Sequence, residues 1–317
     1  MGREMKVLVT GGNGFIGKHI VDQLTKQNIE VVSYDLVPPS LKLEGVQYIT
    51  GTVMDEFQLS RSVKGCDAVF HLAALLGVKR ADIQLLNCMN INIGGTLSVL
   101  KACVLNNVPH VLATSSSEIF GDIAKEKVSE YSQKNPKSGY AVSKLAMEYF
   151  LEGFHREYGL NYNIVRYFNI YGPGQVAEFV VPRFVKMVLN GKSPKIYGDG
   201  KQVRSFCHIT DAAKATVDLF VKNMGVNDSV NIGNDREPVT IAELADKVVV
   251  TCGGTQSPEF LDFSESDRNS SREIYYRVPD ISKIRQLINY EPTIDLEEGL
   301  HSLAYSKDIP DSWVEPL

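Results

Sequence analysis

The sequence predicts an α/β protein built on a doubly wound parallel sheet, followed by a smaller α/β lobe that is partly interleaved with it. Short β-branched runs alternate with helical patterns over the first 170 residues, an order that βαβ crossovers produce. The apolar runs lack strict alternation, which is typical of parallel strands covered on both faces. After about Asn169, glycine and proline become frequent and the elements shorten, which indicates a second architecture.

The elements of the first half follow from these patterns. The first helix carries apolar residues at 16, 20, 21 and 24, a spacing that puts them on one helix face. We expect that face to pack on the sheet. Six runs are predicted as its strands: 6–10, 30–35, 46–50, 68–72, 110–115 and 163–168.

Length and composition place the chain among ordinary globular proteins. Its 317 residues, 44% apolar and 22% charged, can form one large or two medium units with a sizeable core. The formal net charge is −5. There is therefore no electrostatic reason to expect nucleic acid or an anionic membrane as a partner.

Cysteine spacing and apolar runs bear on the compartment. The five cysteines are scattered without a CxxC pair, so we expect buried free thiols in a reducing compartment rather than disulfides or a zinc site. The apolar run at 7–9 is too short for a signal peptide, and we find no apolar stretch of about 18 residues. We expect a cytoplasmic protein with no membrane segment and no bound metal.

A glycine-rich turn follows the first expected strand and opens the first helix. In Thr10-Gly11-Gly12-Asn13-Gly14-Phe15-Ile16-Gly17, the glycines at 11, 14 and 17 are three residues apart. They permit a tight turn, a close approach of backbone to a diphosphate, and close packing of helix on strand. The preceding strand and the amphipathic helix give the motif the context of a dinucleotide site.

Asp35 ends the second strand, 18 residues after Gly17. A carboxylate there accepts hydrogen bonds from both ribose hydroxyls of adenosine and repels a 2′-phosphate. No arginine follows directly, so the predicted cofactor is NAD rather than NADP; an ordinary turn residue is the alternative interpretation. We assign residues 1–170 to an NAD-binding domain of the Rossmann type. Residues 171–317 form mainly a substrate lobe, with some segments returning to the first domain.

Tyr140 and Lys144 are four residues apart, which on a helix puts the phenol and the ammonium on one face. A tyrosine with an ordinary pKa of about 10 is a poor base at neutral pH. A nearby ammonium and a cationic nicotinamide ring would lower that pKa. Tyr140 would then take a proton from a sugar hydroxyl while hydride leaves the same carbon.

Such a pair is common on solvated helix faces, so its surroundings matter. A polar strand end, Thr114-Ser115-Ser116-Ser117-Glu118, precedes it by about 25 residues. These side chains suit a polar site at the carboxyl end of a central strand better than they suit packing. An ordinary strand-to-loop turn is the alternative.

Together these motifs make the chain similar to the extended short-chain dehydrogenases/reductases, in the nucleotide-sugar epimerase/dehydratase family. The resemblance runs from Lys6 to about Leu303. It is specific for the family and much less specific for the reaction. Further matching motifs are His71-Leu72-Ala73-Ala74, Asn92-Ile93-Gly94-Gly95-Thr96, Ile119-Phe120-Gly121, Arg166-Tyr167-Phe168-Asn169-Ile170-Tyr171-Gly172-Pro173-Gly174, Gly198-Asp199-Gly200 with Arg204, Asp211, and Pro279-Asp280-Ile281-Ser282-Lys283.

The resemblance implies particular cofactor contacts. Lys144 would bind the nicotinamide ribose beside Tyr140, Asn92 would support the cofactor, and NAD would lie along the glycine turn. Here Gly51 is followed by Thr52 and Val53 where the family often has an aspartate, so adenine recognition differs and Asp55 is a candidate for it. The expected contacts are Gly11, Gly14, Phe15, Ile16, Gly17, Asp35, Leu36, Thr52, Val53, Leu72, Ala73, Ala74, Asn92, Thr114, Tyr140, Lys144 and Tyr167.

The resemblance also implies substrate contacts. Ser116 would hydrogen-bond the sugar 4-hydroxyl beside Tyr140, and Asn169 would hold the substrate near its diphosphate. Arg204 would pair with that diphosphate, a task suited to a guanidinium group, and Arg272 is a weaker candidate for a second phosphate contact. Tyr197 lies where the family lines its base pocket. Phe120 replaces a family tyrosine and should keep its packing.

The reaction that follows C4 oxidation depends on Glu118. Relatives that are 4,6-dehydratases or sugar-acid decarboxylases carry a glutamate at this position. As base, Glu118 would take the C5 proton while water leaves C6, which makes a nucleotide-sugar 4,6-dehydratase the first choice. Many dehydratases have an aspartate as acid where this chain has Ser117, so the acid is open.

The alternatives are a nucleotide-sugar 4-epimerase, then a nucleotide-sugar-acid decarboxylase. A non-catalytic NAD-binding module is a different class, but such proteins tend to lose the tyrosine or the lysine.

The last two expectations concern the oligomeric state and the role of His71. The helices around 96–105 and 140–158 resemble those that relatives pair in a four-helix bundle, so we expect a homodimer. Met147, Phe150, Leu151 and Phe154 would supply an exposed apolar face, although an ordinary core is the alternative. His71 is expected to pack and hydrogen-bond rather than act as a base.

Overall fold

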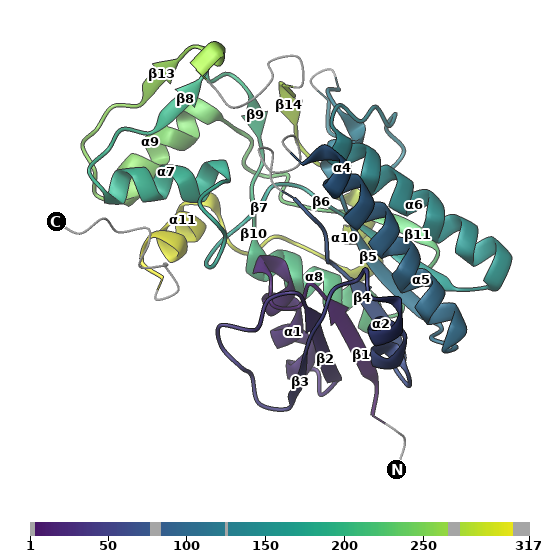
Figure 1. The fold of residues 1–317 in the computed structure, drawn as a ribbon. Coiled ribbons are helices and arrows are strands. Elements are labelled where there is room, and N and C mark those ends of the chain that lie inside the picture. Colours follow the sequence, from purple (N-terminus) through teal and green to yellow (C-terminus); the bar gives the residue numbers. More distant parts are fainter. Residues whose placement is uncertain (1–3, 77–83, 124–125, 266–272, 307–317) are drawn as a thin grey trace.

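The main sheet of the computed structural model has seven parallel strands in the order β11-β6-β5-β4-β1-β2-β3 (Figure 1). The structure describes residues 4–76, 84–123, 126–265 and 273–306. The doubly wound sheet is therefore confirmed. The strands are β1 (Lys6–Thr10), β2 (Glu30–Asp35), β3 (Val46–Thr50), β4 (Ala68–His71), β5 (His110–Ser116), β6 (Asn161–Tyr167) and β11 (Asp228–Ile232).

Six of these strands are the predicted ones, with ends that differ by one or two residues at β4, β5 and β6. The seventh, β11, comes from the second half of the chain and pairs with β6, Asp228 opposite Asn163 and Ile232 opposite Tyr167. The carboxyl ends of β4, β5 and β6 therefore meet at one edge of the sheet, where ligands bind in folds of this kind.

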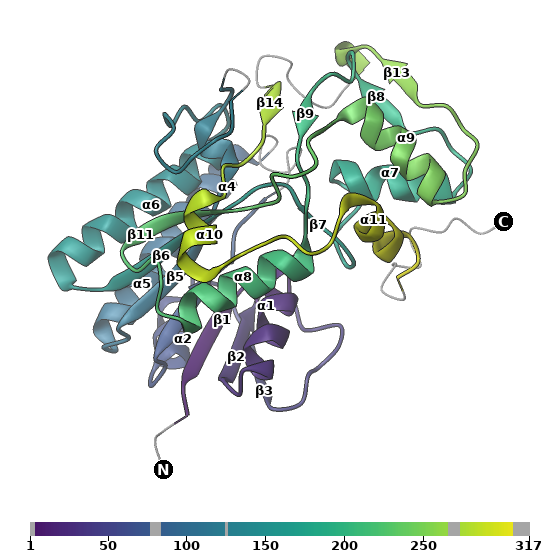
Figure 2. The same ribbon diagram turned by 180° about the vertical axis from the view of Figure 1, so that it is seen from behind.

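Helices cover both faces of the sheet, each over its own apolar core (Figures 1 and 2). The predicted stripe of the first helix is confirmed, because Ile20, Val21 and Leu24 are buried. One face carries α1 (Phe15–Lys26), α8 (Ile209–Val221) and α10 (Ser282–Ile288), and the other carries α2 (Glu56–Val63), α5 (Gly95–Leu105) and α6 (Gly139–Tyr158).

The apolar residues of α6 belong to this core, which corrects the expectation of an exposed face. Met147 and Leu151 are each 1% exposed, and Phe150 and Phe154 pack against the same cluster. Their helical spacing fits burial against the sheet as well as exposure, so sequence alone did not separate the two. The large apolar side chains that α6 does expose are Val142, Tyr149 and Tyr158.

A long apolar helix runs into α5. The short α4 (Leu85–Met89) continues through the π-helical η1 (Asn90–Gly94) into α5. By length and composition, Leu85–Leu105 could cross a membrane, which differs from our expectation that no such stretch occurs. Half of its apolar window is buried inside the protein.

The C-terminal lobe packs three helices around a third core. Three small sheets lie apart from the main sheet: β9 lies between β12 and β14, β7 pairs with β10, and β8 pairs with β13. The helices are α7 (Val180–Leu189), α9 (Ile241–Thr251) and α11 (Leu296–Ala304). The strands are β7 (Ile170–Tyr171), β8 (Lys195–Tyr197), β9 (Val203–Arg204), β10 (Cys207–His208), β12 (Val239–Thr240), β13 (Glu259–Leu261) and β14 (Tyr276–Arg277), and the 3-10 turns are η2 (Ser117–Phe120) and η3 (Phe263–Glu265).

Candidate active site

The turn between β1 and α1 is as tight as its glycines predict. Gly11 has a φ of +70°, and a side-chain carbon there would lie 2.8 Å from the backbone nitrogen of Ala73. A side-chain carbon at Gly17 would overlap the carbonyl oxygen of Gly11. Gly14 precedes the first turn of α1 and supplies no side-chain cap. The turn therefore leaves room and backbone N–H donors for a diphosphate, which fits NAD.

Asp35 lies at the same edge of the sheet, at the end of β2. Its carboxylate accepts the backbone N–H groups of Asn13 and Val37, each at 3.0 Å. These bonds fix the orientation of the carboxylate and leave lone pairs for ribose hydroxyls, because each carboxylate oxygen accepts more than one bond. Leu36 beside it is 69% exposed, and Phe15 and Ile16 are partly buried against the core.

Asn92 joins the segment after β4 to the helix of Tyr140. Its Oδ1 accepts the backbone N–H of Leu75 at 2.7 Å, and its Nδ2 donates to the Ser143 hydroxyl at 3.0 Å. The backbone N–H of Ala73, in the same segment, donates to the Thr10 hydroxyl at 3.3 Å. Leu72 and Ala73 thereby border the glycine turn, and Ala74 follows them in the chain. Their contact with the cofactor stays a prediction.

At the adenine end, Asp55 also has a structural role. Asp55 caps α2 by accepting the backbone N–H of Gln58 at 3.0 Å, so one of its oxygens serves the helix. The Thr52 carbonyl accepts the Tyr34 hydroxyl at 2.9 Å, and Val53 is buried. Adenine contacts by Thr52 and Val53 stay predictions.

Tyr140 and Lys144 lie in the first two turns of α6. The helix begins at Gly139 because the Ser138 hydroxyl accepts the backbone N–H of Ala141 at 3.1 Å. Lys144 Nζ donates to the Thr114 carbonyl at 2.8 Å and lies 5.9 Å from the centre of the Tyr140 ring. The fold thus brings the pair to the carboxyl end of β5.

Burial changes the pKa of both groups. It lowers the pKa of Lys144 to about 8. For Tyr140, burial raises the pKa and the nearby Glu118 charge raises it further, against a hydrogen bond with Ser116 that lowers it. Among the chain's own groups, burial therefore outweighs any lowering of the Tyr140 pKa, because burial disfavours the phenolate. A cationic ring beside the hydroxyl would act in the opposite direction.

Glu118 lies beside this pair, in the turn η2. Its Oε2 accepts the Ser138 hydroxyl at 3.3 Å, and its backbone N–H donates to Ser116 Oγ at 3.2 Å. Ser138 caps the helix of Tyr140, so Ser116, Glu118 and Tyr140 are brought together as the sequence predicts. Ser117, the position considered for an acid, is only 3% exposed.

Asn169 and Arg204 lie on the lobe side of the site. Asn169 Nδ2 donates to the Ser205 carbonyl at 2.8 Å, and its φ of +43° places it in the left-handed region. Arg204 donates to Glu273 Oε1 at 3.5 Å and to the carbonyls of Val203 and Ile274. A diphosphate would have to compete with Glu273 for this guanidinium, so that role stays a prediction.

For three other predicted site residues, the structure gives less information about a role in binding. The Tyr197 ring lies 5.7 Å from the guanidinium carbon of Arg183, on the lobe that was expected to hold the base. The Tyr167 hydroxyl is 2.7 Å from Thr216 Oγ1 of α8, within the core. Arg272 lies outside the described residues.

Arg277 is a candidate that the sequence prediction missed. It lies in β14, in register with Arg204 of β9, and its Nη2 donates to Asn169 Oδ1 at 3.2 Å. Although burial raises the pKa of Tyr140 overall, the Arg277 charge acts to lower it. The only available signal was its place three residues before Asp280 in a matching motif.

His71 is buried and hydrogen-bonded on both sides of its ring. His71 Nδ1 is 2.8 Å from Thr10 Oγ1 and its Nε2 is 3.1 Å from Thr96 Oγ1. Burial, then the Lys144 charge, lowers the pKa of His71 to about 3, so it is neutral and hydrogen-bonded as predicted. Within the ranges that the structure describes, no cluster of three His, Cys, Asp or Glu side chains could hold a metal ion.

A doubly wound sheet, a glycine turn fitted to a diphosphate and a buried Tyr–Lys pair define an enzyme of the NAD-dependent short-chain dehydrogenase type. The chain belongs to the NAD dependent epimerase/dehydratase family, whose model matches residues 7–233. Its members are NAD-dependent enzymes that act on nucleotide sugars, as epimerases, dehydratases and decarboxylases. NAD is therefore the cofactor.

Relatives with different reactions are similar to this chain to nearly the same degree. A UDP-N-acetyl-alpha-D-glucosaminuronate decarboxylase of Bacillus cytotoxicus is 31% identical, over 93% of this chain and 95% of its own. The dTDP-glucose 4,6-dehydratase DesIV of Streptomyces venezuelae, solved with NAD, has a TM-score of 0.89 at 28% identity, covering 98% and 99%. A UDP-glucuronic acid 4-epimerase of Bacillus cereus, also solved with NAD, has 0.86 at 31%, covering 95% and 98%.

Proposed function

We propose that this enzyme oxidises the C4 hydroxyl of a nucleotide diphosphate-linked sugar and then removes a group from C5 or C6 with the help of Glu118. One observation supports the second half in particular. Glu118 is hydrogen-bonded to the cap of α6 at 3.3 Å and its charge acts on Tyr140. A simple 4-epimerase has no need of a carboxylate at that place, because it returns hydride to C4 without touching C5.

In the first step Tyr140 takes the proton of the C4 hydroxyl. Ser116 shares a hydrogen bond with Tyr140 and would hold that hydroxyl in line. NAD held along the glycine turn would supply the acceptor for the C4 hydride and the donor for its return after the second step. Lys144, fixed by the Thr114 carbonyl at 2.8 Å, would orient the nicotinamide ribose and stabilise the phenolate of Tyr140.

A 4-keto group makes two second steps accessible. In a 4,6-dehydratase, which the sequence favours, Glu118 takes the C5 proton and the C6 hydroxyl leaves as water. The C5–C6 double bond that results then takes the hydride at C6 and a proton at C5. Ser117 is a weak acid for that departure, and it is buried. In a decarboxylase the substrate is a β-keto acid after oxidation, so the C5–C6 bond breaks, CO2 leaves, and C5 takes a proton before hydride returns to C4.

The decarboxylase is the second candidate because of Arg277. A guanidinium group near Tyr140 suits an anionic substituent on the sugar better than a neutral hydroxymethyl group. Among the relatives, the Bacillus cytotoxicus decarboxylase and the Bacillus cereus 4-epimerase are named for sugar acids. They show that this fold accepts a carboxylate at C5.

The test is the fate of the sugar in D2O. The protein with NAD is incubated with UDP-, dTDP- and GDP-linked hexoses and with UDP-linked hexuronates, and products are analysed by mass spectrometry and NMR. We expect loss of water or of CO2, with deuterium at C5. A C4 epimer without deuterium at C5 would sink this proposal.

Glu118→Gln separates the two steps. We expect this variant to keep C4 oxidation, seen as reduced NAD and a 4-keto sugar, while the second step slows about 100-fold or more, the usual contribution of a general base. Glu157→Gln, an exposed change on the same α6 helix, should leave both steps unchanged. A Glu118→Gln enzyme with the wild-type product and rate would remove Glu118 from the reaction.

A further inference from the structure

We propose that the buried ion pair of Arg166 and Glu148 positions the reacting groups of the active site. The pair holds the turn that carries Glu118 against the helix that carries Tyr140 and Lys144. This inference rests on the proposed function, because it concerns the support of the same site. Arg166 and Glu148 contact no reacting atom in the proposed reaction, so they are positioning residues rather than catalytic ones.

The pair itself is buried and fully formed. Arg166 is 2% exposed and Glu148 is 1% exposed. Nε and Nη2 of Arg166 donate to the two carboxylate oxygens of Glu148 at 2.9 and 2.8 Å, and Lys134 Nζ lies 3.5 Å from Glu148 Oε2. Because a buried ion pair adds little stability compared with apolar side chains of similar volume, stability alone does not explain its place here.

The guanidinium of Arg166 contacts the chain on both sides of the loop between η2 and α6. Its central carbon lies 5.3 Å from the centre of the Phe120 ring, a favourable arrangement of a cation over an aromatic face. Phe120 ends η2, two residues after Glu118. Nη1 of Arg166 donates to the Glu130 carbonyl within the loop at 3.1 Å. One side chain of β6 therefore joins the turn, the loop and, through Glu148, the helix α6.

The register of the sheet explains why Arg166 reaches α6. Ala113 of β5 is opposite Ile164 of β6, and both belong to the apolar core beneath α6. Two residues later, Ser115 is opposite Arg166. Because side chains two apart on a strand share one face of the sheet, Arg166 lies on the α6 face at the end of β6 where the reacting groups gather.

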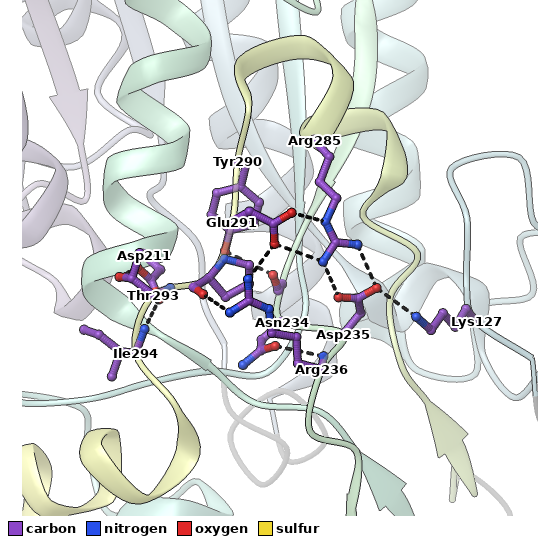
Figure 3. A network of polar contacts seen from close by, with 12 residues as sticks. Lys127, Asp211, Asn234, Asp235, Arg236, Arg285, Tyr290, Glu291, Thr293 and Ile294 are labelled. Atoms are coloured by element: carbon purple, nitrogen blue, oxygen red, sulfur yellow. Dashed lines mark hydrogen bonds and ion pairs between the residues drawn. The ribbon is translucent and has the colours of Figure 1, made fainter.

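A second polar network holds the same loop where it meets α10 (Figure 3). Lys127 donates to Asp235 Oδ2 at 2.8 Å, and Arg285 of α10 donates to both Asp235 oxygens at 3.0 and 2.8 Å. Lys127 precedes Glu130 by three residues. The loop is thus fixed on its α10 side by this network, and Arg166 supplies the contact toward η2 and α6.

Glu148 also acts on Lys144, one helical turn before it, because residues four apart lie on one face of a helix. Burial lowers the pKa of Lys144 to about 8, and the charges of Cys88 and Glu148 oppose that change. His71 and Tyr140 are the other titratable groups beside the ammonium. An ordinary thiol is mostly uncharged at neutral pH, so the carboxylate of Glu148 supplies the negative charge that keeps Lys144 protonated.

The first experiment follows the pH dependence of C4 oxidation. Formation of reduced NAD with an accepted nucleotide sugar is measured from about pH 6 to about pH 9 for the wild type, Glu148→Gln and Glu148→Asp. The reaction needs the charged form of Lys144, so activity is lost as pH rises through its pKa. Removing the Glu148 charge lowers that pKa, and the alkaline limit of activity should therefore fall by about one pH unit. Glu148→Asp keeps the charge and should keep the wild-type limit.

The second experiment replaces the pair by apolar side chains. The double variant Arg166→Met with Glu148→Met leaves no buried charge without a partner, so it should unfold at a temperature close to that of the wild type. Without the guanidinium, Phe120 and the turn of Glu118 lose their support. We expect the second step to slow about 10-fold more than C4 oxidation, because small displacements of a reacting group are costly. Normal stability with slowed chemistry distinguishes positioning from a role in folding.

Glu152→Gln is the matched control. Glu152 lies one turn after Glu148 on α6, but its side chain is 35% exposed and 4.0 Å from Arg156. This variant should keep both the alkaline limit and the ratio of the two steps. An unchanged alkaline limit in Glu148→Gln, or an unchanged ratio of steps in the double variant, would overturn the proposal. If the double variant does not fold, the comparison of Glu148→Gln with Glu148→Asp decides.

Failure of this inference differs from failure of the proposed function. If Glu118→Gln keeps the wild-type product and rate, the proposed function fails by a result that involves neither Arg166 nor Glu148. If Glu118→Gln slows the second step while Glu148→Gln and the double variant keep wild-type values, the reaction stands and the positioning role falls.

Discussion

The hydroxyl of Tyr140 lies where opposite influences on its ionisation meet. Burial and the Glu118 charge raise its pKa, and Ser116 and Arg277 lower it. The fold by itself therefore keeps Tyr140 protonated near neutral pH. In our proposal the tyrosine becomes a base only with the oxidised, cationic nicotinamide ring next to it, so proton removal is coupled to the presence of the oxidant.

Replacing Tyr140 by phenylalanine should reduce C4 oxidation by a factor of about 10² to 10⁴, because it removes the proton acceptor while keeping the ring. Tyr149→Phe is the matched control on the same helix, where the side chain is 61% exposed. The readout is formation of reduced NAD with an accepted nucleotide sugar. Equal rates for the two variants would exclude Tyr140 from the chemistry.

His71 should make the protein less stable in acid. Its pKa is about 3 in the fold, lowered by burial and the Lys144 charge, against about 6.5 in the unfolded chain. The unfolded state therefore binds the proton first, and stability is lost as pH falls below about 6.5. At pH 5 the loss from this group is about 2 kcal/mol.

The measurement is urea unfolding of the wild type and His71→Asn at pH 7 and pH 5. The variant loses hydrogen bonds and should be less stable at both values. From pH 7 to pH 5, however, its free energy of unfolding should fall by about 2 kcal/mol less than that of the wild type. Equal pH dependence in both proteins would show that His71 is protonated in the native state.

The sequence predicted those site residues that are identified by spacing within a single element. The glycine turn, Asp35 and the pair Tyr140 and Lys144 each follow from spacing within one element, and the structure places them as that spacing requires. Arg277 could not be found this way. Its place depends on bonds between the segment before α10 and a loop more than a hundred residues earlier, which no local pattern records.

The loop between η2 and α6 is the element that unites the two ends of the chain. It connects Glu118 to Tyr140, and Val128 in it forms a bridge to Pro279. Asp235 stabilises this arrangement because it binds Lys127 of the loop and Arg285 of α10. Burial would raise the pKa of Asp235, but the hydrogen bonds from Arg285 and Lys127 outweigh burial and lower it.

Asp235→Ala should destabilise the protein by about 2 to 3 kcal/mol, because it leaves a half-buried guanidinium with one carboxylate fewer. The Asp235 side chain is 7% exposed, whereas Glu291, the other acid on Arg285, is 51% exposed. Glu291→Ala should therefore cost less than about 1 kcal/mol. Thermal unfolding at pH 7 compares the two.

The contribution of Asp235 also has a pH signature. Its folded pKa lies below the ordinary value, so its stabilisation is present above about pH 4 and is lost as pH falls further. Equal destabilisation by both alanine variants would contradict a special role for the buried acid.

At the level of elements, long β-branched runs were predictable and short polar ones were not. The six predicted runs became strands because their apolar residues match a buried sheet. The seventh strand, Asp228-Ser229-Val230-Asn231-Ile232, is half polar. Distant residues bond to it: the backbone N–H of Asn231 donates to Glu130 and its Nδ2 donates to the Val128 carbonyl, so its strand state depends on tertiary contacts.

The whole molecule raises the question of assembly. We predict a homodimer through α5 and α6, as the resemblance implies, but on a different surface from the one first expected. Met147, Phe150, Leu151 and Phe154 belong to the core. The exposed apolar residues available for a partner copy are Leu105 of α5 and Val142, Tyr149 and Tyr158 of α6.

Sedimentation at micromolar concentration should give twice the mass of one chain. The double variant Leu105→Glu and Tyr149→Glu should sediment as a folded monomer, because it places charges in an apolar contact. Substitution of two exposed residues with no predicted contact, Lys201→Glu and Val250→Thr, is the control. A wild type that sediments as a monomer would contradict the dimer.

The last strand to join the main sheet has a consequence for synthesis of the protein. β11 covers the outer edge of β6, and its residues follow those of β6 by about sixty positions. While the ribosome makes that stretch, β6 presents a row of unpaired backbone groups, the kind of edge on which other chains can add. The nascent chain is therefore prone to aggregate through β6 until Ile232 has emerged from the exit tunnel.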